Sequence, residues 1–155
     1  FQSDILFGSI QDVFDPRVWE FIPKTGKADI EEGGKALLFN LPTSASFMFL
    51  RALEDCLRKF CGVLDSNSSD KMFGEALNLI ASRKDAIDMP EKDVERQIKL
   101  LQYIKDEFRN PSAHPDKHFT QREAEQLFQF VNVAIDKLSA MFESVSSSKE
   151  GADAD

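Results

Sequence analysis

The sequence has few of the features that mark membrane, secreted or disulfide-stabilised proteins. It contains two cysteines, and no apolar run approaches the roughly 20 residues that a membrane-spanning helix needs. Residues 1–4 carry neither the basic nor the long apolar region of a secretory signal. Two thiols in a chain of 155 residues suit a reducing compartment. We therefore expect a cytoplasmic protein that makes no contact with a membrane.

Good candidates for a disulfide or a metal site are also scarce. Cys56 and Cys61 are five positions apart in a helical pattern, which places them about 140° apart around the helix axis. A disulfide between them is therefore not expected, and both are read as small buried side chains. His114 and His118 do not share a regular helical turn, because Pro115 lies between them. No metal ion or other cofactor is expected.

The chain has fewer basic than acidic residues. The chain has 19 Lys and Arg residues against 27 Asp and Glu residues, which gives a net charge of −8. Proteins that bind nucleic acid usually present a basic field to the phosphates. Any contact with RNA is therefore expected to be local and not steered by the whole surface.

The strict two-residue alternation of β-strands is missing, and apolar residues recur instead at helical spacing. The sequence predicts one all-α domain, a bundle of five to six helices over residues 1–143, followed by a disordered Ser-rich and acidic tail over 144–155. Asp29-x-x-Glu32 and Thr120-x-x-Glu123 match the capping box that begins a helix. The expected helices are 3–14, 29–39, 42–64, 70–84, 90–108 and 120–142.

Two glycines interrupt the second expected helix. Gly33 and Gly34 each cost about 1 kcal/mol relative to alanine inside a helix. Two interpretations stay open: the glycines allow another helix to pack closely, or they mark a kink.

The segment between the last two expected helices carries the candidate chemistry. It includes Arg109, Asn110 and His114, and prolines at 111 and 115 restrict its backbone. Asn110-Pro111 is expected to end the preceding helix. An arginine offers a planar, permanently charged fork for phosphate, and a histidine can move a proton near neutral pH. The alternative is structural: the arginine caps a helix and the histidine only forms hydrogen bonds.

This segment resembles the Arg-x4-His signature of the HEPN domain family. The match consists of Arg109, Asn110 directly after it, His114 and Pro115. Residues 29–54 are similar to the helix pair that precedes the signature in one bacterial branch of that family. The resemblance covers roughly residues 29–142. It implies a helical bundle that forms a homodimer in which the two motifs face one another.

In active members of the family, the resemblance implies metal-independent RNA cleavage. The ribose 2′-hydroxyl attacks the adjacent phosphate and leaves a cyclic phosphate and a 5′-hydroxyl. His114 would transfer the proton, Arg109 would bind the scissile phosphate, and Asn110 would orient His114 or bind the phosphate. The resemblance also implies a toxin or phage-defence role and a protein antitoxin. Antitoxin-modified members carry a tyrosine where this chain has Asp116, so modification there is not expected.

Glu54 lies on the apolar stripe of the third expected helix, between Arg51 and Arg58. A carboxylate in such a place needs a partner. Two interpretations stay open: Glu54 pairs with Arg58 one turn along, or it reaches across the bundle to orient Arg109 or His114. Glu54 and Arg51 are therefore the expected supporting residues of the site.

The function is also left with an alternative. The chain is an endoribonuclease, a non-catalytic HEPN-like module that binds a protein partner or a nucleotide through the same loop, or an unrelated helical scaffold. Phe47, Phe49 and Phe130 are the candidates for an exposed dimer surface.

Overall fold

Helices account for most of residues 9–153, the part of the chain that the computed structural model describes; side chains are described up to Val145. The longer helices are α2 (Pro16–Phe21), α3 (Lys24–Leu38), α4 (Pro42–Leu64), α5 (Phe73–Ser82), α6 (Glu91–Ile104) and α8 (Gln121–Asp153). The short ones are the 3-10 helices η1 (Ile10–Val13) and η2 (Lys84–Ala86), the π-helix η3 (Lys105–Arg109) and α7 (Asn110–Ser112). The predicted all-α bundle of five to six helices is confirmed.

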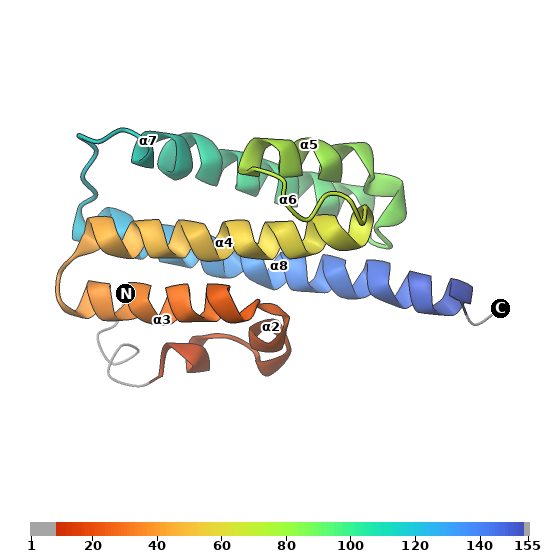
Figure 1. Ribbon diagram of the computed structural model, residues 1–155, viewed down its shortest axis with the longest axis horizontal. Helices are drawn as coiled ribbons and strands as arrows, with labels where there is room; N and C mark the ends of the chain where they lie inside the picture. The colour runs from red at the N-terminus through yellow and green to blue at the C-terminus, as the bar shows by residue number, and fades with distance from the viewer. Residues whose placement is uncertain (1–8, 154–155) are drawn as a thin grey trace.

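The helices form three layers around a central pair (Figure 1). Helices α4 and α8 pack together in the middle, α3 and α2 cover one side, and α5, α6 and α7 cover the other. Helix α4 buries Phe49, Leu53, Cys56 and Phe60 completely, at the spacing of one helical face. In the described part of the chain, no helix has the length and hydropathy needed to cross a bilayer.

The two glycines of α3 allow helices to approach closely. A Cβ atom added at Gly33 would lie 2.5 Å from a ring carbon of Phe49, and one added at Gly34 would lie 2.7 Å from Ile10 Cδ1. Neither glycine ends or breaks α3, which continues to Leu38. The close-packing interpretation is therefore confirmed.

The N-terminal part differs from the sequence prediction. Most of the first expected helix lies outside the described residues, and only η1 forms within it. Asp15-Pro16, which directly follows the expected helix 3–14, begins α2, and the Asp15 side chain accepts a hydrogen bond from the Arg17 amide at 2.8 Å. Helix α3 begins at Lys24, five residues before the expected start at 29. Asp29 consequently lies inside α3 and caps nothing.

Two further predictions need correction. Phe49 is completely buried and cannot belong to an exposed dimer surface, whereas Phe47 is 41% exposed and Phe130 is half-buried. Helix α8 does not end near 143: it continues to Asp153, and Val145 is still buried against the core. No proline follows Phe142, so nothing in the sequence forces the backbone to leave the helix there.

The Gly33 contact predicts a specific cost. Gly33→Ala places a methyl group against a fully buried ring, and overpacking of this kind typically costs about 1–3 kcal/mol of unfolding free energy. Gly62→Ala is the matched control, because its Cβ would lie 3.4 Å from the nearest described atom, on Ser69. In denaturant unfolding, Gly33→Ala should destabilise the protein and Gly62→Ala should be neutral or stabilising. Equal effects of the two substitutions would contradict the packing interpretation.

Candidate functional site

The helix that carries Arg109 does not stop before proline. Asn110 has helical dihedral angles (φ −65°, ψ −48°), so the prediction that Asn110-Pro111 ends the helix is wrong. Pro111 has no amide hydrogen and its ring would collide with a carbonyl four residues back in a regular α-helix. The chain avoids this conflict by forming the wider π-turn of η3, in which the Asn110 amide donates to the Lys105 carbonyl. Helical backbone therefore continues through α7.

Arg109 reaches from this turn to α4. Its Nε donates to Glu54 Oε1 at 2.6 Å, and the side chains are 27% and 19% exposed. The hydrogen bond is short and charge-assisted, which makes it stronger than a neutral one. Glu54 therefore pairs across the bundle with Arg109, as the second of its two interpretations predicts, and not with Arg58 along the same helix. Because the contact uses Nε, the two terminal Nη groups keep their donors for another ligand.

A hollow of about 260 Å³ lies beside this ion pair, between α4 and the end of the α6–α7 helical segment. One wall comes from Phe47, Leu50, Arg51 and Glu54 of α4, and the other comes from Arg109, Ser112 and Ala113. We call it the Arg109 hollow. It combines two guanidinium groups, one carboxylate and one exposed aromatic ring.

Arg51 connects this hollow to a second one of about 230 Å³ between α3 and α4, which Arg51 and Glu54 also line. Arg51 Nε lies 3.3 Å from Asp29 Oδ2, and Arg51 is 65% exposed while Asp29 is 14% exposed. Burial raises the pKa of Asp29, and the Arg51 guanidinium partly opposes that shift. Both arginines of the Arg109 hollow are thus paired with a carboxylate through Nε.

The structure does not bring every predicted site residue into the hollow. Arg109, Glu54 and Arg51 meet there, whereas Asn110 and His114 are exposed and line neither of the two hollows. The His114 amide donates to the Pro111 carbonyl at 3.1 Å, and the His114 carbonyl accepts from the Lys117 amide at 3.1 Å. These turns fix the backbone of the loop. Among the side chains that the structure describes, none forms a hydrogen bond with the imidazole of His114.

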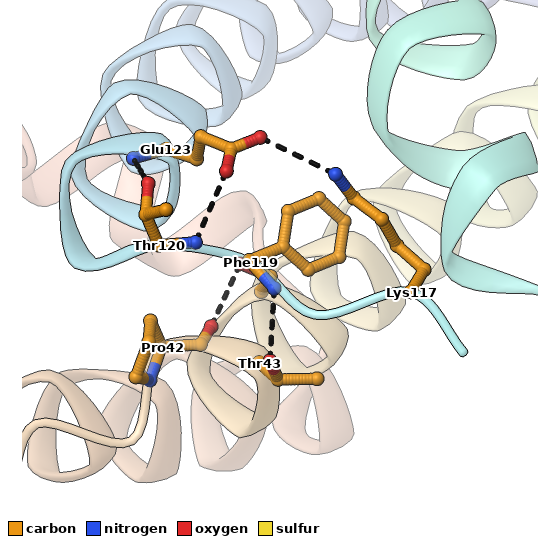
Figure 2. Close-up of polar contacts among 7 residues, drawn as sticks. Pro42, Thr43, Lys117, Phe119, Thr120 and Glu123 are labelled. Carbon is orange, nitrogen blue, oxygen red and sulfur yellow. Dashed lines mark hydrogen bonds and ion pairs between the residues drawn. The ribbon is translucent and has the colours of Figure 1, made fainter. Parts of the chain in front are cut away.

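Hydrogen bonds hold the chain on both sides of the His114 loop. Before His114, the Ser112 hydroxyl donates to the Arg109 carbonyl at 2.7 Å. After it, the amide of the buried residue Phe119 donates a hydrogen bond to Thr43 Oγ1 of helix α4 at 3.0 Å (Figure 2). Thr120 and Glu123 then form the predicted capping box, with both reciprocal contacts at 3.1 Å. The exposed turn that carries His114 is therefore short and held on both sides.

The cysteines take no part in this site. Both are free thiols without exposed surface, as the sequence predicts. Burial raises the pKa of Cys61 to about 11 and raises that of Cys56 still further. In the described part of the chain, no group of three His, Cys, Asp or Glu side chains has an arrangement suited to a metal ion.

Three residues of this region have roles that do not follow from the sequence. The sequence pattern places Asp29 at a helix cap, gives Phe47 no role beside the charged groups, and gives Thr43 no role at all. Only a three-dimensional arrangement brings Thr43 to Phe119, 76 positions away. No family model matches the chain, and no curated protein or solved structure is significantly similar to it.

The capping box predicts a pH-dependent contribution to stability. The Thr120 amide, which donates to the Glu123 carboxylate, holds the pKa of Glu123 below its ordinary value of 4.5, and Lys117 adds to the effect. A carboxyl with a lowered pKa stabilises the fold above its ordinary pKa, and that stabilisation is lost as the pH falls through the folded-state value. The difference in unfolding free energy between wild type and Glu123→Gln should therefore shrink on acidification below 4.5.

Denaturant unfolding at a series of pH values measures this difference. Glu125→Gln, which removes a carboxylate two residues further along the same helix and leaves the capping box intact, is the matched control. Thr120→Ala should cost about 1 kcal/mol near neutral pH, as expected for loss of an N-cap. A Glu123→Gln difference that does not vary with pH would contradict the capping interpretation.

Proposed function

We propose that this chain is a metal-independent endoribonuclease in which Arg109 and His114 act on a phosphodiester of RNA. The observation that carries the proposal is the Arg109–Glu54 contact at 2.6 Å, in a hollow that Arg51 also lines. The contact fixes the plane of the Arg109 guanidinium and leaves both Nη groups to bind two phosphate oxygens. Glu54 is a positioning residue in this proposal.

The chemistry follows from these groups. The ribose 2′-hydroxyl attacks the adjacent phosphorus and loses its proton, the P–O5′ bond breaks, and the 5′ oxygen gains a proton. The products are a 2′,3′-cyclic phosphate and a 5′-hydroxyl. Arg109 stabilises the charge that develops on the phosphoryl oxygens, and the exposed imidazole of His114 transfers a proton. Asn110, also exposed beside them, hydrogen-bonds the phosphate or orients the imidazole.

A second copy of the chain belongs to this proposal. His114 does not line the hollow that its own Arg109 lines, and the proposal therefore places His114 of one copy at the hollow of another. In a symmetric homodimer, the loop of one copy reaches the hollow of the other. The role of a toxin or phage-defence nuclease with a protein antitoxin is the setting that the family resemblance implies.

A non-catalytic module is the second candidate. It is favoured by the net charge of −8 and by the carboxylate that already neutralises each arginine of the hollow. Such a module would bind a nucleotide or a protein partner through the same loop without cleaving RNA.

Cleavage of a labelled single-stranded RNA in EDTA separates the two candidates. Wild type should cut the RNA to products with cyclic phosphate ends, and Arg109→Ala and His114→Ala should each lose about 100-fold or more of the rate. His118→Ala and Arg96→Ala are matched controls, because both residues are exposed outside the hollow. A substrate with 2′-deoxy sugars should resist cleavage.

Two results would overturn the nuclease proposal. Wild-type protein that leaves every RNA intact would favour the non-catalytic module. Cleavage that persists unchanged in both Arg109→Ala and His114→Ala would place the activity elsewhere or in a contaminant.

A further inference from the structure

Phe47 is an aromatic residue that does not belong to the hydrophobic core. It is 41% exposed on α4, whereas Phe49 and Phe60 of the same helix are completely buried. Its ring forms part of the Arg109 hollow, together with the apolar side chains of Leu50 and Ala113. An exposed ring in a hollow gives a flat apolar surface next to charged groups.

The spacing along α4 puts this ring in line with the charged groups. Phe47, Arg51 and Glu54 occur at steps of four and three residues, so they share one face of the helix. Seven residues of α-helix span about 10 Å, which separates the ring from the Glu54–Arg109 pair without taking it out of the hollow. One end of the hollow is therefore aromatic and the other end carries the guanidinium of Arg109.

A nucleotide has the chemistry that this arrangement recognises. A base stacks on an aromatic ring through its flat face, and a phosphate binds the fork of an arginine. The hollow, at about 260 Å³, is smaller than the roughly 300–1,000 Å³ of sites for drug-sized ligands, so it holds a part of a longer chain. Its one carboxylate, Glu54, is already bound to Arg109 and presents less repulsion to a phosphate.

We propose that Phe47 stacks an unpaired base of single-stranded RNA whose neighbouring phosphate lies on Arg109. The inference rests on the proposed function, because it names the part of the substrate that the same hollow holds. Stacking on a side chain needs a base that is not paired and stacked within an RNA duplex, so Phe47 makes the site selective for unpaired nucleotides. Phe47 is a specificity-determining residue and takes no part in proton transfer.

Fluorescence of a stacked base tests the proposal independently of cleavage. The probe is a short single-stranded RNA with one 2-aminopurine, made resistant by 2′-O-methyl groups; stacking on an aromatic ring quenches its fluorescence. Phe47→Leu keeps an apolar side chain but removes the flat ring. It should weaken binding about 10-fold and abolish the quenching, in line with the usual worth of one stacked base. Phe47→Tyr keeps a flat ring and should therefore retain both the binding and the quenching.

The controls separate base stacking from contact with any exposed ring and from contact between proteins. Phe39→Leu changes a ring that is 77% exposed and does not line the hollow, so it should leave binding and quenching unchanged. Adding the protein should not change the fluorescence of the same probe in a duplex, where the base is already stacked on its neighbours. Unchanged quenching in Phe47→Leu, or an equal loss in Phe39→Leu, would overturn the proposal. So would an effect of Phe47→Leu on sedimentation alone, which would make the ring a protein contact.

The stacking proposal and the nuclease proposal fail in different ways. Quenching that depends on Phe47 in a protein that cuts no RNA would support stacking and reject catalysis. Cleavage that depends on Arg109 and His114 but keeps its rate and its preference for unpaired RNA in Phe47→Leu would support catalysis and reject stacking.

Discussion

The ion pair between Glu54 and Arg109 holds together the region on which the functional argument depends. It connects the central helix α4 to the end of the helical segment that leads into the His114 loop. Both side chains are mostly removed from solvent, so each would leave a poorly solvated charge if its partner were lost. The pair therefore fixes two things at once: the position of the loop against α4 and the direction of the guanidinium.

Under the proposed function, the same interaction would explain how an acidic protein offers a site for phosphate. With a net charge of −8, the whole surface does not attract RNA, and binding must come from groups held in place. Contact through Nε orders the Arg109 guanidinium in advance and reduces the entropy lost when an anion binds. The cost is partial neutralisation of the arginine. Arg51 adds a second guanidinium to the hollow and is itself paired with Asp29.

How much of the fold the sequence predicts depends on whether a signal is local. Thr120-x-x-Glu123 predicts a real capping box, and helix α4 has the predicted bounds, because both depend on residues close together in the chain. The predictions for the start of α3 and for the passage through Asn110-Pro111 are wrong. At Asn110, a π-turn overrides the rule for residues before proline, and a hydrophobic pattern does not reveal such a turn.

The candidate site is predictable only in part for the same reason. The identities of Arg109, Asn110 and His114 follow from a motif, but their surroundings do not. Glu54 has two possible partners in the sequence, and only the packing of α6 and its continuation against α4 decides between Arg58 and Arg109. Phe47 and Phe49 are two positions apart, and the sequence does not tell which is exposed, since a long helix packed on several sides has no single apolar stripe.

A double-mutant cycle on Glu54→Ala and Arg109→Ala, measured by denaturant unfolding, tests the central claim most directly. The account predicts a coupling free energy of about 1.5–3 kcal/mol, the usual range for a charged hydrogen bond. The Asp29–Arg51 pair, in which the arginine is largely exposed, should give at most about 1 kcal/mol when treated in the same way. A Glu54–Arg109 coupling no larger than that of Asp29–Arg51 would contradict the account, because the pair would then hold neither the loop nor the guanidinium in place.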